Sequence, residues 1–377
     1  MNEKEIGEIR RRFSAAKSNI NHIRGCCVST EGQILSEFDQ SLAFLTEDEI
    51  DKILGIIRKT LSGYVGRNLS DIEFSTKQVL ESAEHKALMD IRDSDMNDDE
   101  AVHELYKRII ESLEGIEDNY IIMLASDKYD VPSRRVDGEK GDDSNEIFRY
   151  FVCCICPIKT SRSQLGFYIS GNPFRSVSAD TVVTAPELGF MFPCFDDRST
   201  NIYKALFYTK STQNDYSKFI DTLFKSEVIP LPADIQKETF NTIVEKVAEE
   251  QCNLHVVKTL HNQLNEMILE HKEQKVEEPL FLDKNQIVSV LESSGLEEKQ
   301  ISEFRDKFDT EFGEKAQISP RNVVETKQFR LKTPDVVIKV DPKRTDLIKT
   351  RVIDGEKYIL ISAEGDIEVN GINISIT

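Results

Sequence analysis

The chain contains 377 residues, a length that is too great for one ordinary hydrophobic core and that predicts two or three domains. Its formal net charge of −19 disfavours binding to nucleic-acid backbones or to anionic lipid, because both are negatively charged themselves. No apolar run approaches the roughly 20 residues of a membrane-spanning helix, the start lacks a secretory pattern, and the seven cysteines form a poor disulfide framework, so we expect a cytoplasmic protein.

Helix and strand patterns alternate over residues 1–229. A charged helix is predicted over residues 1–16, because Ile6, Ile9 and Phe13 recur at spacings of three and four. Thr46 and Glu49 form a capping box that begins another helix. The other elements predicted in this part are a hairpin of residues 25–28 and 33–38, a strand over 69–75, and helices over 76–91 and 97–113.

Residues 119–169 are predicted to form the centre of a β-sheet. The run from Tyr120 to Ala125 is continuously apolar, which is typical of a strand buried on both faces. Residues 134–146 are polar and contain glycine, so we expect a loop there. Residues 147–158 then carry bulky side chains that would crowd every side of a helix, and they predict a second buried strand.

The pattern becomes helical at residue 230. Helices are predicted over residues 237–275, 283–294 and 297–312, and the last two are hinged at Gly295. This section carries 10 basic and 19 acidic residues up to residue 317. We expect its apolar stripe to pack against the N-terminal domain or to contact a second copy of the chain. Formation of a homodimer is therefore an alternative that the sequence leaves open.

After Pro320, apolar residues recur at every second position, which is the spacing of a β-strand. Asp354-Gly355 and Asn370-Gly371 are strong hairpin-turn dipeptides, and residues 336–340 predict a further strand. The chain therefore predicts an α+β protein. Its three expected parts are a mixed α/β domain with a central sheet over 1–229, an α-helical section over 230–317, and a small antiparallel β-meander over 318–377.

The strongest candidate site lies in residues 185–203, where apolar side chains alternate with proline and glycine. Two adjacent carboxylates stand beside a guanidinium in this segment, a combination that can bind a cation or a polar ligand. We predict that the carboxylates and the guanidinium supply polar contacts and that two phenylalanines supply an apolar floor. The predicted ligand-binding residues are Glu187, Phe192, Phe195, Asp196, Asp197, Arg198 and Asn201.

A structural role explains the same segment equally simply. Its phenylalanines would then plug a loop into the core, and Arg198 would neutralise a neighbouring aspartate. On this interpretation Asp197 or Ser199 caps a helix into which Ile202 and Tyr203 lead.

Two other patterns resemble metal sites but have simpler explanations, and we expect no metal and no cofactor. Along a strand, Cys154 and Cys156 share one face while Cys153 points to the other, so buried free thiols are expected. Residues 93–104 have the ligand spacing of a calcium loop. Its sixth position is Asp98 rather than glycine, which favours an acidic helix start instead.

Residues 318–377 carry 10 basic and 9 acidic residues and are the one portion that is electrostatically compatible with nucleic acid. The residues that would contact phosphate are Lys339, Lys343, Arg344 and Arg351. Small basic spots of this kind are more often solvated surface, and the acidic N-terminal part disfavours DNA contact.

Several stretches resemble a bacterial family that is known as an uncharacterised domain of unknown function, and the resemblance covers nearly the whole chain. The matching stretches are residues 5–13, 36–41, 186–203, 333–340 and 351–360. This resemblance implies no activity and no catalytic residue. In the order of its elements the chain is also similar to the bacterial nucleoid-associated protein family.

These observations predict a non-enzymatic intracellular protein that binds a protein or small-molecule partner or has a regulatory role. The first alternative is nucleoid or other nucleic-acid association through the C-terminal part. The second alternative is a hydrolase in which Asp196 and Asp197 hold a divalent ion.

Overall fold

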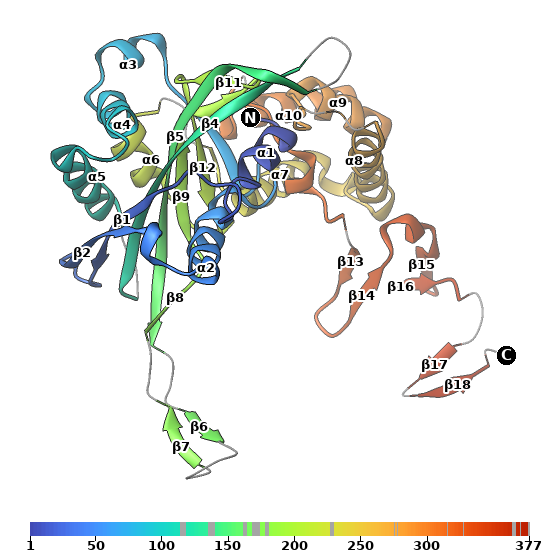
Figure 1. Cartoon of the computed structure of the whole chain (residues 1–377). Coiled ribbons are helices and arrows are strands. Elements are labelled where there is room, and N and C mark those ends of the chain that lie inside the picture. Colours follow the sequence, from blue (N-terminus) through green and yellow to red (C-terminus); the bar gives the residue numbers. More distant parts are fainter. Residues whose placement is uncertain are drawn as a thin grey trace. The chain divides into compact units, whose positions relative to one another are not determined.

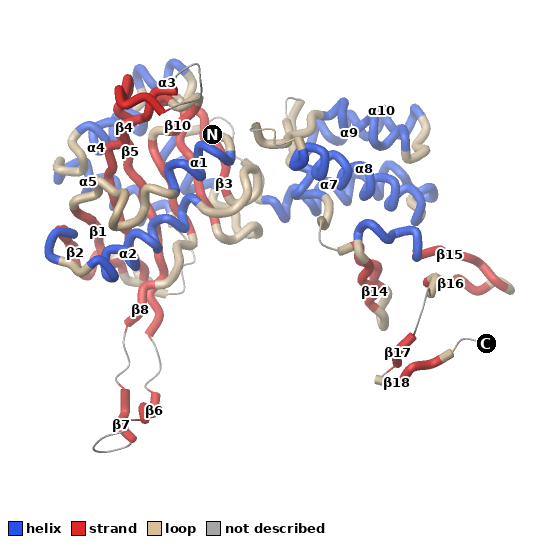
Figure 2. Tube along the Cα trace, turned by 45° about the vertical axis from the view of Figure 1, so that its right-hand side comes forward, coloured by secondary structure: helices blue, strands red, loops and turns tan. Residues whose placement is uncertain are grey.

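The computed structural model describes residues 1–375 except 114–117, 135–139, 161–163, 168–173, 178–180, 227–229, 275, 277, 315, 327, 364–366 and 370. For residues 133–134, 140–146, 160, 164–167, 174–177 and 250 it describes the backbone alone. The chain folds as two compact units, which are described separately below (Figures 1 and 2). Unit 1 comprises Met1–Ala233 with Glu277–Pro279, and unit 2 comprises Asp234–Val276 with Leu280–Thr377. The predicted α+β class is confirmed.

A seven-strand antiparallel path forms the centre of unit 1, and a short eighth strand, β8 (Thr181–Val183), pairs with one of its members. The two long strands β4 and β5 lie in the middle, as the sequence predicts. The strand order is β2 (Ile34–Ser41), β1 (His22–Val28), β4 (Tyr120–Arg134), β5 (Lys140–Thr160), β9 (Leu188–Phe192), β12 (Lys204–Thr209) and β3 (Leu69–Glu73).

Helices cover both faces of this sheet (Figure 1). One face is covered by α4 (Ala83–Asp93), α5 (Asp99–Ser112) and α6 (Ser217–Phe224), and the other by α1 (Glu3–Arg10) and α2 (Glu47–Ile57). Successive residues of β5 therefore enter two different cores. Phe151, Cys153 and Ile155 pack under α4–α6, whereas Tyr150, Val152, Cys154 and Cys156 pack under α1 and α2. This burial on both faces explains the continuous apolar runs of the central strands.

Three expected elements differ from the structure. The polar segment 134–146 is not wholly a loop, because β4 and β5 continue their pairing to Arg134↔Lys140, while residues 135–139 lie outside the described part. The helix expected over residues 76–91 is interrupted at Ser82, which ends α3 (Thr76–Glu81) and whose hydroxyl accepts from the backbone N–H of His85 to cap α4. The first helix ends at Arg10 rather than near residue 16.

Unit 2 is built on four helices: α7 (Ala233–Ala248), α8 (Leu254–Glu273), α9 (Lys284–Ser293) and α10 (Glu298–Glu311). Phe240, Leu264, Leu291, Phe304 and Phe308 are among the side chains of their common core. Among the described residues, none of the helices of either unit combines the length and apolar character that spanning a bilayer requires.

The C-terminal strands of unit 2 pair locally. They form three two-stranded hairpins, and the turn of the second is the predicted Asp354-Gly355, both with positive φ. The hairpins are β13 (Phe329–Lys332) with β14 (Val337–Val340), β15 (Ile348–Ile353) with β16 (Glu356–Ile361), and β17 (Ile367–Val369) with β18 (Ile372–Ile374). The division of the whole chain into three domains stays a prediction.

Candidate functional site

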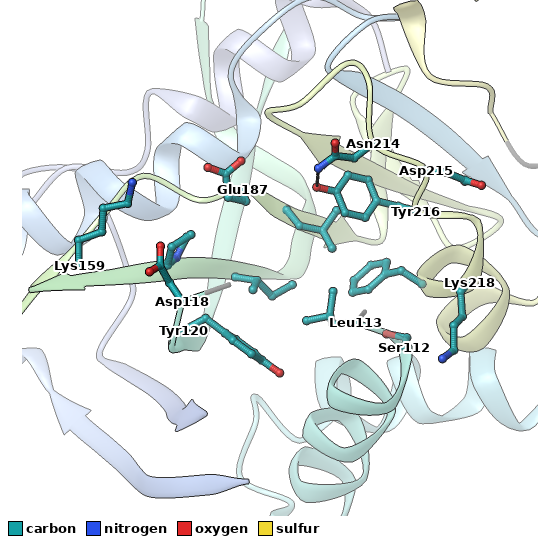
Figure 3. Close-up of a pocket in the computed structure, with 14 residues that line it drawn as sticks. Ser112, Leu113, Asp118, Tyr120, Lys159, Glu187, Asn214, Asp215, Tyr216 and Lys218 are labelled. Atoms are coloured by element: carbon teal, nitrogen blue, oxygen red, sulfur yellow. Dashed lines mark hydrogen bonds between the residues drawn. The ribbon is translucent and has the colours of Figure 1, made fainter. Parts of the chain in front are cut away.

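A cavity of about 570 Å³ opens in unit 1 at one end of the central sheet (Figure 3). It lies where α5 ends, β4 begins, β5 ends, β9 begins and the loop before α6 meets that helix. Its volume is within the range of pockets that hold small organic molecules. The lining residues are Ser112, Leu113, Asp118, Tyr120, Ile155, Pro157, Lys159, Glu187, Leu188, Asn214, Asp215, Tyr216, Lys218 and Phe219.

Apolar side chains form the inner part of this cavity. Ile155, Leu188 and Phe219 belong to the hydrophobic core under α4–α6, and Leu113 packs against that core. Ile155 faces the cavity because it lies on the same side of β5 as Phe151 and Cys153. An apolar part of a ligand would therefore lie directly on the core of unit 1.

Tyr120 supplies a phenol to the same lining. Its side chain as a whole is 3% exposed. Burial raises the pKa of Tyr120 to about 12, so the phenol stays neutral and can donate a hydrogen bond. A neutral phenol on the wall of a cavity is placed where it can donate a hydrogen bond to a ligand acceptor.

Two carboxylates at the cavity are already engaged by the protein. Glu187 accepts from Lys210 Nζ at 2.5 Å, and Asp215 accepts from the backbone N–H of Ser217 at 2.8 Å at the start of α6. The Tyr216 hydroxyl accepts from Asn214 Nδ2 at 3.2 Å, which leaves its own proton to donate. The Tyr120 and Tyr216 hydroxyls can therefore donate at the wall, and Asp118 is a further carboxylate of the lining.

Lysines lie at two edges of the cavity. The ammonium groups of Lys159 and Lys218 lie on opposite sides of it (Figure 3), and both side chains are exposed. Asp118 lies on the same side as Lys159. The cavity thus has an apolar floor, neutral phenol donors and charged edges.

The charged cluster that the sequence singles out lies at a hairpin turn. Asp197 and Arg198 have φ values of 50° and 61° and connect β10 (Cys194–Asp196) to β11 (Ser199–Asn201). A turn with two successive positive φ values matches the twist of a two-residue hairpin. A helix capped by Asp197 or Ser199 was the wrong expectation, because Ser199 continues into a strand.

The side chains of this turn have partners within unit 1. Asp196 accepts from the amino group of Met1 at 2.7 Å and from Asn201 Nδ2 at 2.8 Å. Arg198 donates to Glu8 at 2.6 Å and to the carbonyl oxygen of Pro132 at 3.0 Å, while Asp197 is exposed. The cluster thus ties the N-terminal helix to the sheet.

The other three predicted residues, Glu187, Phe192 and Phe195, lie in three different parts of unit 1. Phe192 packs under α4–α6 with Phe74 and Phe151, whereas Phe195 packs on the opposite face of the sheet with Phe148. Of the seven predicted residues, Glu187 lines the cavity and the other six do not. The structure therefore does not bring the seven into one pocket.

Tyr120, Tyr216 and Lys218 were missed by the sequence reasoning. Tyr120 opens an apolar run, which identifies a strand and gives no sign of a cavity. A local signal does exist at Asp215-Tyr216-Ser217, where the Asp215 carboxylate accepts from the backbone N–H of Ser217, the first residue of α6. That signal predicts a helix boundary and only indirectly a ligand.

The two metal-like patterns have structural partners. Asp98 accepts from the backbone N–H of Ala101 and caps α5, as expected for an acidic helix start. Lys128 pairs with Asp95, and Arg24 donates to Asp99 at 2.7 Å. Among the described residues no group of three His, Cys, Asp or Glu side chains is arranged to hold a metal ion.

The cysteines allow a direct test of the burial pattern. Burial raises the pKa of Cys153 and of Cys194, and hydrogen bonding to Cys156 together with burial raises the pKa of Cys154. We expect these thiols to react with a disulfide reagent only when the protein is unfolded. The half-buried Cys27 and Cys252 should react in the folded protein, and mass spectrometry of partially labelled chains would identify the sites. Rapid labelling of Cys153 under native conditions would contradict the assignment.

The residues proposed for nucleic-acid contact lie in unit 2 on three elements. Lys339 is on β14, Lys343 and Arg344 are on the short 3₁₀ helix η4 (Pro342–Leu347), and Arg351 is on β15. All four side chains are exposed, and Arg344 also donates to Asp346 at 3.3 Å.

Comparison with known proteins gives one family. A family model described as Domain of unknown function (DUF4317) matches residues 1–372. No curated protein matches the chain. The matched residues include the whole lining of the cavity and the first two C-terminal hairpins, and they end at the first residue of β18.

Proposed function

Because the chain belongs to the DUF4317 family, whose description assigns no activity, we propose a function from the geometry of unit 1: the protein binds a small organic molecule in the cavity at the end of the central sheet. The ligand carries an apolar body and at least one hydrogen-bond acceptor. Binding, rather than chemical conversion of the ligand, is the proposed activity.

The neutral phenol of Tyr120 beside the apolar floor of the cavity is the observation that carries this proposal. A hydrogen bond from this phenol to a ligand acceptor contributes about 0.5–1.5 kcal/mol. The apolar floor of Leu113, Ile155, Leu188 and Phe219 gives the body of the ligand its place. A volume of about 570 Å³ is large enough for a molecule with one or two rings.

The polar groups at the cavity favour binding over catalysis. The Ser112 hydroxyl donates its hydrogen bond to the carbonyl oxygen of Ile109 at 2.7 Å. This hydrogen bond goes to the backbone and not to a general base that would activate the hydroxyl as a nucleophile. Glu187 and Asp215 are occupied by Lys210 and Ser217. Phenols donate hydrogen bonds to acceptors, and lysines attract anions.

A fragment screen by ligand-observed NMR tests the site. The probes are a set of aromatic carboxylates, aromatic amines and neutral aromatic amides. We expect binders in the first and third classes, and Leu113→Trp, which fills the floor, should abolish their binding. Tyr120→Phe should weaken binding about tenfold, since losing one hydrogen bond to a buried donor corresponds to about 1.4 kcal/mol.

Tyr208→Phe is the matched control for this screen. Tyr208 is also a buried tyrosine with a pKa raised to about 12 by burial, but it packs on the opposite face of the sheet and does not line the cavity. Binding that survives Leu113→Trp, or that Tyr208→Phe weakens as much as Tyr120→Phe, would refute the assignment of the ligand to this cavity.

A further inference from the structure

Exposed apolar side chains concentrate in the C-terminal hairpins of unit 2. Of the 23 large apolar side chains that are exposed in the described part of the chain, ten lie between residues 336 and 374. This segment is about a tenth of the chain, so the concentration is far above an even distribution. On one face of the second hairpin Ile353 is 42% exposed and Tyr358 is 40% exposed, while Val352 on its opposite face is 68% exposed. Apolar surface gathered in this way marks an interaction site.

The hairpins are attached at one end and open at the other. Phe329, at the start of β13, packs edge-on against His261 of α8 at 5.1 Å between ring centroids. Ile348, at the start of β15, is fully buried, and its carbonyl oxygen accepts from Lys258 of α8 at 3.0 Å. Beyond these two contacts with α8, the strands pair only within each hairpin. A two-stranded sheet with both faces exposed is only marginally stable in water.

The strands β13–β16 are also strongly basic. They carry six Lys or Arg residues and a single carboxylate, Glu356, although the chain as a whole has a net charge of −19. Register places Arg351 opposite Tyr358 and Lys349 opposite Leu360, so these four side chains share one face of the second hairpin. Ile353 and Glu356 lie on the same face, which therefore carries two cations and one carboxylate. A partner for this face needs carboxylates around an apolar centre.

Helix α8 presents such a surface. Leu269 is 41% exposed, and Glu266, Glu270 and Glu273 lie beside it at spacings of one, three and four residues, all exposed. The stripe begins one turn after Asn262, which contacts Thr345 at the root of the second hairpin. The hairpins of the same chain leave the stripe uncovered.

We propose that the hairpin face of Lys349, Arg351, Tyr358 and Leu360 docks on the α8 stripe of a second copy of this chain. Both copies contribute one hairpin and one stripe, so the two contacts are equivalent and close a two-fold dimer. The charges of the two surfaces are complementary, and the exposed apolar side chains of both leave water. This interface is independent of the cavity in unit 1.

Sedimentation velocity over a range of protein concentrations tests the interface through charge reversal. The wild-type chain should form a concentration-dependent dimer. Lys349→Glu with Arg351→Glu should weaken association at least about tenfold, and Glu266→Lys with Glu270→Lys should do the same, because each places like charges in contact. The protein that carries all four changes restores opposite charges and should dimerise again.

The control reverses two exposed lysines elsewhere, Lys107 on α5 and Lys299 on α10, to glutamate. This variant has the same net charge as the hairpin variant and should dimerise like the wild type. A wild-type chain that stays monomeric, or a fourfold variant that stays monomeric while each twofold variant is folded by circular dichroism, would overturn the proposal. Equal loss in the control would show that overall charge rather than this contact governs association, and would overturn it as well.

Discussion

Replacing Asp127 by alanine should lower the free energy of unfolding of unit 1 by about 3–5 kcal/mol. Asp127 is 3% exposed and accepts from Arg12 Nε at 2.6 Å, from Arg12 Nη2 at 3.0 Å and from the hydroxyl of the buried Tyr150 at 2.9 Å. Its removal would leave a largely buried guanidinium and a fully buried phenol without their acceptor. Removing one partner of a buried pair is strongly destabilising, because the other partner then stays buried without compensation.

The pKa values of Arg12 and Tyr150 also reflect their interaction with Asp127. Burial lowers the pKa of Arg12, but the hydrogen bonds and charge of Asp127 raise it above its usual value. Burial, followed by the charge of Asp127, raises the pKa of Tyr150 well above its ordinary range. The guanidinium therefore stays charged and the phenol stays neutral, and both depend on the same carboxylate.

Urea denaturation followed by circular dichroism would measure the effect. Asp48→Ala is the control, because Asp48 also pairs with a cation, Lys52, but both side chains are more than 70% exposed. An exposed pair of this kind contributes little to stability, because water and salt screen its charges. A loss below about 1 kcal/mol for Asp127→Ala would mean that the network does not hold the N-terminal segment to the sheet.

The second large effect concerns the amino group of Met1. Met1 is 6% exposed, and its amino group donates to Asp71 at 2.9 Å and contacts Asp196 at 2.7 Å. Burial lowers the pKa of this group, but the charges and hydrogen bonds of Asp71, Cys194 and Asp196 outweigh burial and raise it from 8.0 to about 10.

A raised pKa means that the folded state binds the proton more tightly than the unfolded state. The stabilisation is therefore complete below pH 8 and is lost as the pH rises to about 10. A shift of two units corresponds to about 3 kcal/mol. We expect the free energy of unfolding to fall between pH 7 and pH 10.5 in the wild-type chain. This fall should be about 3 kcal/mol larger than in a variant with Asp71→Asn and Asp196→Asn.

N-terminal acetylation gives an independent comparison, because it removes the charge at every pH. The acetylated chain should start with lower stability and show a flatter decline with alkaline pH. Parallel declines in the wild type and in the double aspartate variant would contradict the assignment, since other groups would then cause the whole effect. A chain with a short tag before Met1 should behave like the acetylated one.

The cavity and the hairpin face give the two units separate proposed roles. Unit 1 offers a cavity with an apolar floor and phenol donors, and unit 2 offers a hairpin face with lysine and arginine together with an acidic stripe. Ligand binding and dimerisation can therefore be measured separately. Leu113→Trp should leave the dimer intact, and the charge reversals on β15 should leave fragment binding intact.

Local chemistry made a large part of the fold predictable. Thr46 and Glu49 form their capping box, Asp354-Gly355 forms its turn, and the apolar runs around Tyr120 and Phe151 lie in the two central strands. Each of these features depends on side chains and backbone groups within a few residues of one another. Even the alternate burial of Cys153 and Cys154 follows from the two-residue period of a strand.

The site was decided by contacts between distant parts of the chain. Asp196 looked like a ligand-binding carboxylate, but its partner is the amino group of a residue 195 positions away. Tyr120 looked like the start of a buried strand, but it lines a cavity that five separate segments enclose. The sequence by itself determined which segments are helices and strands, because those preferences are local. Only the tertiary structure decided which polar groups pair with one another and which line the cavity, because hydrogen-bond partners are chosen by packing and not by position along the chain.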